Sequence, residues 1–143
     1  MSATGLDVFD KTLQTTNSWL KEIMETVGPD RQRAYRVLRA VLHALRDRLT
    51  VDEVAHLGAQ LPLLVRGLYY DQWHPAGKPA RMRHIEEFLA AVSAELDDLG
   101  PINAEEAARA VFAVLDEHIA PGEIQDVKGM MPRELRELWP EEA

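Results

Sequence analysis

Apolar residues recur at helical spacing along most of the chain, and this pattern predicts an all-α protein. In the first segment the positions expected to be buried stand three and four residues apart, at Phe9, Leu13, Thr16, Leu20, Ile23 and Val27. Such spacing places one stripe on one face of a long helix. Residues 31–49 and 85–99 show comparable stripes and predict two further long helices. Helix packing alone can cover these faces, so no sheet is needed.

Capping signals divide this pattern into separate helices. Asp30 follows Gly28 and Pro29, where one helix would end and the next begin. The stretch from Thr50 to Glu53 predicts a capping box, in which each side chain accepts from the other residue's backbone amide. Asn103 predicts a further cap. Short helices are expected to begin at three prolines, Pro62, Pro121 and Pro132.

The chain contains an internal repeat with an offset of 70 residues, which is the separation of Pro62 and Pro132. Residues 61–70 read LPLLVRGLYY and residues 131–140 read MPRELRELWP. At the same offset each half predicts two long helices followed by two short ones. We therefore expect a single domain over residues 1–143, with repeat one at 6–70, a linker at 71–80 and repeat two at 81–140. Two units that share one core favour a compact helical bundle with a pseudo-twofold axis.

Two stretches resemble a known family. They are RLTVDEVAHLGAQLP at residues 48–62, and GEIQDV at 122–127 together with MPRELRELWP. They are similar to a bacterial family of uncharacterised proteins, domain of unknown function 2267, and the resemblance extends over about residues 9–140. It implies a small all-helical bacterial protein with two similar halves. It implies no established reaction and no catalytic residues.

Composition narrows the classes of function. The chain has 143 residues, with 24 acidic and 16 basic side chains and a formal charge of −8. A surface of this sign repels nucleic acid and anionic membranes. Since cysteine is absent, disulfides, thiolate nucleophiles and cysteine-ligated metals are excluded. No secretory signal or membrane-length apolar run is evident, so we expect a cytoplasmic protein without nucleic-acid or membrane partners.

Two glutamates and two arginines recur at equivalent positions, namely Glu53 with Glu123 and Arg66 with Arg136. These side chains could line a shared polar site. We favour a structural interpretation, in which each Glu caps a helix and each Arg reaches a carboxylate or a carbonyl at a helix end. Repetition in both halves favours architecture over asymmetric chemistry.

The sequence disfavours both a metal site and a DNA site. Glu53 and His56 form a Glu-x-x-His motif of the type found in di-iron bundles, but the position equivalent to His56 is Asp126. We therefore expect no metal and no cofactor. Residues 49–67 have the outline of a helix-turn-helix, yet the would-be recognition helix is apolar apart from one arginine, which disfavours DNA binding.

The segment from the end of the first repeat into the linker and beyond, residues 69–84, is the strongest candidate for a binding surface. It combines aromatic and basic side chains, which are common anchors of protein interfaces. These are Tyr69, Tyr70, Trp73, His74, Lys78, Arg81 and Arg83. The plainer interpretation is a linker whose aromatic residues cover the edge of the core.

No motif for nucleophilic catalysis, phosphate binding or dinucleotide binding is present. The leading hypothesis is therefore a non-enzymatic protein-interaction or scaffolding module with a protein partner, and a homodimer is a further form of assembly. The alternative is a protein that binds a small ligand in a crevice between the two repeats. A ligand-binding pocket predicts a thermal shift with a metabolite, whereas an interaction module predicts co-purification with a protein.

Overall fold

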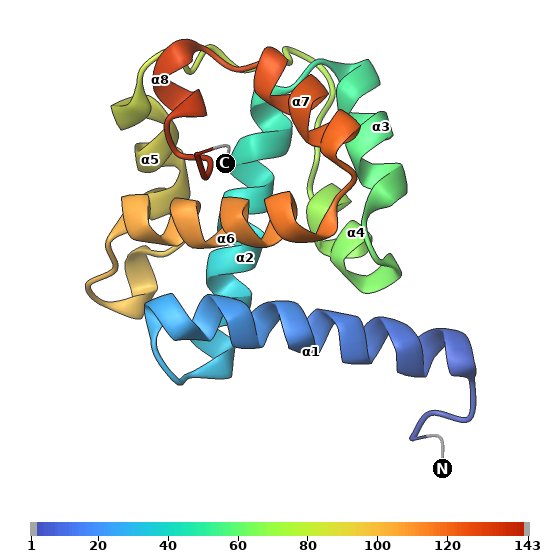
Figure 1. The fold of residues 1–143 in the computed structure, drawn as a ribbon. Coiled ribbons are helices and arrows are strands. Elements are labelled where there is room, and N and C mark those ends of the chain that lie inside the picture. The colour runs from blue at the N-terminus through green and yellow to red at the C-terminus, as the bar shows by residue number, and fades with distance from the viewer. Residues whose placement is uncertain (1–2, 142–143) are drawn as a thin grey trace.

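The computed structural model describes residues 3–141 and confirms the prediction of an all-α protein (Figure 1). In this range the chain forms eight α-helices and one short 3-10 helix, and no strand. The elements are α1 (Asp7–Val27), α2 (Arg31–Arg48), α3 (Val51–Gln60), α4 (Leu63–Tyr70), α5 (Ile85–Ala94), η1 (Asp97–Leu99), α6 (Ala104–His118), α7 (Pro121–Gly129) and α8 (Arg133–Arg136). None of the described helices is both long and apolar enough to cross a membrane.

Three of the predicted capping residues begin helices as expected. The side chain of Asp30 accepts a hydrogen bond from a backbone amide in the first turn of α2. Thr50 and Asn103 do the same for α3 and α6, at 3.3 Å and 3.0 Å. A cap of this kind stabilises a helix by about 1 kcal/mol, because it pairs an amide that lacks a partner within the helix.

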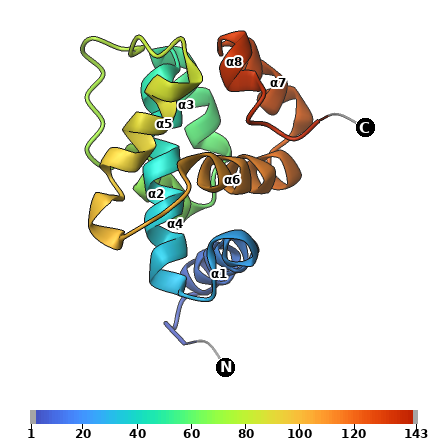
Figure 2. The ribbon, with the colours of Figure 1, turned by 90° about the vertical axis from the view of Figure 1, so that its left-hand side faces the viewer.

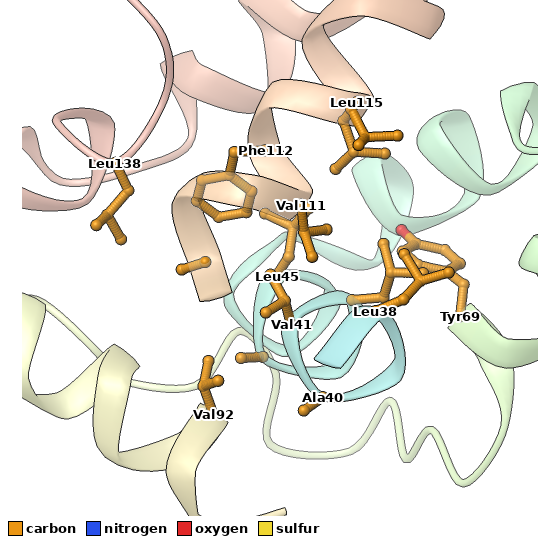
Figure 3. Close-up of a cluster of buried hydrophobic side chains, with 14 of the residues drawn as sticks. Leu38, Ala40, Val41, Leu45, Tyr69, Val92, Val111, Phe112, Leu115 and Leu138 are labelled. Atoms are coloured by element: carbon orange, nitrogen blue, oxygen red, sulfur yellow. The ribbon is translucent and has the colours of Figure 1, made fainter. Parts of the chain in front are cut away.

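The core is built around α2 and α6 (Figure 3). Val41 and Leu45 of α2 are buried together with Val111 and Phe112 of α6. Trp139, near the C-terminus, stacks on Phe112 with ring centroids 4.2 Å apart. The buried apolar residues of both halves form a single cluster. Each fully buried Leu, Val or Phe side chain contributes about 1.5–3 kcal/mol to folding, so this cluster is the main source of stability.

Helix α1 is only partly covered by the rest of the molecule. It packs against α2 and α6 (Figure 2), and Trp19 and Ile23 in its C-terminal half are buried. Its N-terminal half contacts α4, where the hydroxyl of Thr12 accepts a hydrogen bond from the backbone amide of Leu64 at 2.9 Å. Its N-terminal end projects beyond the other helices (Figure 1). Phe9 and Leu13 are therefore 47% and 41% exposed. The prediction of one continuous buried stripe is wrong for these two positions, because a helix of 21 residues is longer than the surface it crosses.

The second half begins differently from the first. Helix α5 has ten residues, the same length as α3, where the sequence predicted a long helix to Leu99. It ends at Ala94, and side chains of α2 bind the next residue, Glu95. Arg36 donates to the backbone carbonyl of Glu95 at 2.8 Å, and Arg39 and His43 contact its carboxylate at 3.3 Å and 3.0 Å. The chain then forms the 3-10 helix η1.

The connection between the halves is anchored to α2. It lacks helix from residue 71 to residue 84, four residues beyond the expected linker. The guanidinium group of Arg46, which is buried, donates to the carbonyls of Tyr69 and Asp71 at 2.8 Å and 2.7 Å. Arg48 donates to the carbonyl of Met82 at 3.1 Å. Basic residues of α2 thus fix the path of this segment.

Candidate functional site

Two glutamates meet where α3 of the first half packs against α7 of the second (Figure 1). Glu53 and Glu123 each occupy the third position of their helix. Only 4% of Glu53 and 8% of Glu123 are exposed to solvent. Buried carboxyl groups are uncommon in proteins unless they are paired with a partner. This pair is therefore the most unusual polar feature of the described chain.

One oxygen atom on each glutamate lacks a hydrogen-bond partner. These atoms are Oε1 of Glu53 and Oε2 of Glu123, and both are buried. The predicted capping box is only half formed, since Glu53 donates its amide to Thr50 but its carboxyl group does not return to the Thr50 amide. Instead Oε2 of Glu53 lies 3.5 Å from Nδ1 of His56. Leaving such atoms unpaired costs about 1–3 kcal/mol each, so the arrangement needs a physical explanation.

The environment favours the protonated form of Glu123. Burial raises the pKa of Glu123 to about 8, and a hydrogen bond with Glu53 and the negative charges of Glu53 and Asp126 add to the effect. Two carboxylates this close cannot both be charged without a compensating positive charge. Near neutral pH the pair therefore holds either a proton or a cation.

The same residues present a set of metal-binding atoms. One carboxylate oxygen from Glu53, one from Glu123 and one ring nitrogen of His56 lie within 4.8 Å of one another. A second group of this kind lies elsewhere, formed by Glu22, Glu117 and His118. The second group is half-buried to exposed, whereas both glutamates of the first are buried. The junction of α3 and α7 therefore differs from a surface cluster.

The repeated arginines do not join the glutamates. Nη2 of Arg66 donates to the carbonyls of Ala59 and Leu61 at 3.2 Å and 3.0 Å. Nε of Arg136 donates to the carbonyl of Met131 at 2.8 Å. Each arginine thus binds backbone carbonyls where the preceding helix of its own half ends. The structure brings the two glutamates together and places the two arginines at the ends of α3 and α7.

The aromatic residues of the predicted loop surface belong largely to the interior. Tyr69 is fully buried, and its hydroxyl donates to the carbonyl of Val54 at 2.9 Å. Tyr70 and Trp73 are half-buried and pack against the core, and the Trp73 ring nitrogen is buried. These side chains follow the plainer interpretation, in which aromatic residues cover the edge of the core.

The cations of that segment have a different position. His74, Arg81 and Arg83 are exposed, and Lys78 is half-buried. These four side chains can contact a partner, but Tyr69 cannot contribute to the same surface because it is buried. The aromatic-basic surface as a whole stays a prediction, and the structure separates its cations from its anchor residues.

A groove of about 390 Å³ lies between the N-terminal half of α1 and the turn from α3 to α4. Its walls include Val8, Leu61 and Leu63, together with the cations Lys11 and Arg66. Many of the exposed large apolar side chains gather on these elements, namely Leu6, Val8, Phe9, Leu13, Leu63 and Leu64. The sequence analysis did not identify this groove, and the spacing of Phe9 and Leu13 assigned these two exposed residues to the core.

Comparison with known proteins identifies one family. Residues 16–138 match the sequence model of the family described as "Uncharacterized conserved protein (DUF2267)". A search of curated proteins gives no match. The matched range contains both glutamates of the junction, His56 and the turn from α3 to α4. It begins at Thr16, so Phe9 and Leu13 lie before it.

Proposed function

The chain belongs to the DUF2267 family of uncharacterized conserved proteins, and from this starting point we propose that it is a non-enzymatic protein-interaction module. The observation that carries the proposal is the groove between the N-terminal half of α1 and the turn from α3 to α4, together with the exposed apolar side chains of these elements. Phe9 and Leu13 continue the stripe that is buried further along α1 at Leu20 and Ile23. Large apolar side chains gathered on one surface are typical of protein-binding sites.

The occupant we propose is one amphipathic helix of a protein partner. Along the covered half of α1 the apolar stripe is packed by helices, α2 and α6. The groove beside the N-terminal half of α1 has apolar walls, so a further helix can pack into it by the same interdigitation of side chains. A helix in this position would bury Val8 and Leu63, which line the groove.

Charge indicates that the partner helix is acidic next to its apolar face. Lys11 and Arg66 line the groove, and no described residue lining it carries a carboxylate. Nε of Arg66 is buried without a hydrogen-bond partner. This local positive charge stands out on a chain with a formal charge of −8. A carboxylate on the partner can pair with these cations and set the orientation of the helix.

The test uses the small number of lysines in the chain. Only four are present, at positions 11, 21, 78 and 128. Lysine-directed cross-linking in the native host, followed by mass spectrometry, should join the partner to Lys11. The double variant Val8→Asp/Leu63→Asp should abolish that cross-link, because it places charge on the apolar walls of the groove.

A second double variant, Arg81→Glu/Arg83→Glu, serves as the matched control and tests the loop surface. Partner cross-links at Lys78 that are lost only in this control would refute the groove and support the loop. Cross-links between Lys11 residues of two copies would identify the occupant as a second copy of the chain, contrary to the proposal. Circular dichroism verifies that both variants remain helical.

We further propose that the two halves are repeats related by a pseudo-twofold axis. Glu53 and Glu123, 70 residues apart, occupy the same position of equivalent helices and face each other. Arg66 and Arg136 each bind the carbonyl of the residue five positions earlier. Local geometry of this kind supports duplication of one unit, although α5 is shorter than α1.

Small-ligand binding between the halves is the alternative function. The observation that favours it is the pair of unpartnered carboxyl oxygens of Glu53 and Glu123 at the junction of α3 and α7. A thermal-shift screen of metabolites tests it, and a ligand whose effect is lost in Glu123→Gln would support it. Cytoplasmic location and a bacterial origin stay predictions.

A further inference from the structure

Glu53 and Glu123 present two buried carboxyl groups to each other at the junction of α3 and α7. Each glutamate is more than nine-tenths buried, and each has one oxygen without a hydrogen-bond partner. The repeated arginines, Arg66 and Arg136, bind backbone carbonyls instead of these carboxyl groups. Nearby, the hydroxyl of Tyr69 is already committed to the carbonyl of Val54. Two buried carboxyl groups with unpaired oxygens can act as ligands of a cation.

We propose that the junction of α3 and α7 binds one divalent transition-metal ion through Glu53, Glu123 and His56. This inference gives the small-ligand alternative a ligand class and rests on the same junction. It does not depend on the groove beside α1.

The distances suit a single ion. The three donor atoms lie within 4.8 Å of one another, and Nδ1 of His56 is 3.5 Å from Oε2 of Glu53. Three ligands bound to one ion at about 2.1 Å lie about 3.0–3.6 Å from one another. The most widely separated donors therefore need to move together by roughly 1–2 Å. Such a movement is within reach of His56, whose side chain is 67% exposed.

The types of donor indicate the class of ion. Two carboxylate oxygens and one imidazole nitrogen suit Mn²⁺, Fe²⁺, Co²⁺ or Zn²⁺. Mg²⁺ and Ca²⁺ prefer oxygen ligands only, so His56 disfavours them. Chains that bind copper(I) through sulfur need cysteine or methionine ligands, which this junction lacks. Transition-metal chemistry with mixed oxygen and nitrogen ligands is therefore the expected class.

The site has an entry path. His56 and Asp126 are both exposed, on α3 and α7 respectively, so an ion can arrive from solvent on that side. Water can complete the coordination shell of an ion held by Glu53, Glu123 and His56.

The experiment titrates the full chain with Co²⁺ after removal of metals with a chelator, followed by visible absorption and calorimetry. We expect one ion per chain, with a spectrum typical of nitrogen and oxygen ligands. Glu53→Gln and Glu123→Gln should each weaken binding by at least about tenfold, since loss of even an outer partner of a metal ligand costs 10–100-fold. His56→Ala should weaken it and change the spectrum.

The matched control is Glu117→Gln, which alters the other carboxylate-histidine cluster by the same chemical change. Binding that is lost in Glu117→Gln but kept in Glu53→Gln would overturn the proposal and assign the ion to that second cluster. Absence of saturable binding by the folded chain, or a stoichiometry unaffected by both junction variants, would also overturn it and leave a shared proton as the occupant. A metabolite that still gives a Glu123-dependent thermal shift would then preserve the small-ligand alternative without the metal.

Discussion

Replacing Glu123 with glutamine should change the stability of the protein in a pH-dependent way. Burial beside Glu53 raises the pKa of Glu123 from 4.5 to about 8. A carboxyl group whose pKa is raised on folding adds stability below the unfolded pKa and loses it as the pH rises through the folded pKa. As the pH rises from 4.5 to about 8, deprotonation of Glu123 therefore lowers the free energy of unfolding of the wild-type protein. Glutamine, a neutral isostere of the protonated acid, carries no such dependence.

The magnitude follows from the pKa values. One unit of pKa corresponds to about 1.4 kcal/mol, so the interval from pH 5 to pH 7.5 corresponds to about 3 kcal/mol. The free energy of unfolding of Glu123→Gln should exceed that of the wild type by about 3–4 kcal/mol at pH 7.5 and by less than about 1 kcal/mol at pH 5.

The assay is urea unfolding followed by circular dichroism at both pH values, with a chelator present so that no metal ion occupies the pair. Glu137→Gln, an exposed change of the same chemistry, is the matched control and should show no such gain. If Glu123→Gln lowers stability at pH 7.5, or gains equally at both pH values, the reasoning about a buried and protonated carboxyl group is wrong.

Three further predictions concern other contacts. Tyr69→Phe should lower the free energy of unfolding by about 1–2 kcal/mol in urea titrations, because it removes the 2.9 Å hydrogen bond to the carbonyl of Val54 and leaves only the 3.4 Å bond from Tyr70. Gly58→Ala should cost about 1–3 kcal/mol, since a Cβ there would clash with the ring of Tyr70. Glu134→Gln should lower the pKa of His84, measured by NMR titration, because the hydrogen bond and charge of Glu134 raise it. For Gly58→Ala, a displacement of Tyr70 without loss of stability would contradict the prediction. For Glu134→Gln, an unchanged pKa of His84 would contradict it.

Local patterns in the sequence predicted most of the helices. The residues that cap α2, α3 and α6, Asp30, Thr50 and Asn103, act within one turn of their own position. Apolar spacing likewise depends only on the period of the helix. Fold class could therefore be predicted from neighbours along the chain. The end of α5 could not, because it is set by side chains of α2 that bind Glu95 from a distant part of the sequence.

The candidate surfaces were harder to predict for a related reason. An aromatic residue at the end of a helix can belong to a binding surface or to the edge of the core. Tyr69, in the last turn of α4, is buried and therefore belongs to the core. An apolar stripe has the same spacing whether or not another helix covers it. The exposure of Phe9 and Leu13 therefore depends on how far α1 extends past the helices it crosses.

The repeat at an offset of 70 residues marked Glu53 and Glu123 as equivalent, and the sequence alone determined their chemistry and their places in two short helices. Only the tertiary structure decided that α3 packs against α7 and that both carboxyl groups are buried face to face with His56 beside them. Helical period and capping are local interactions, whereas the approach of two helices depends on the shape of the whole core. Equivalent residues can lie at opposite ends of a molecule or share one site, and packing makes the difference.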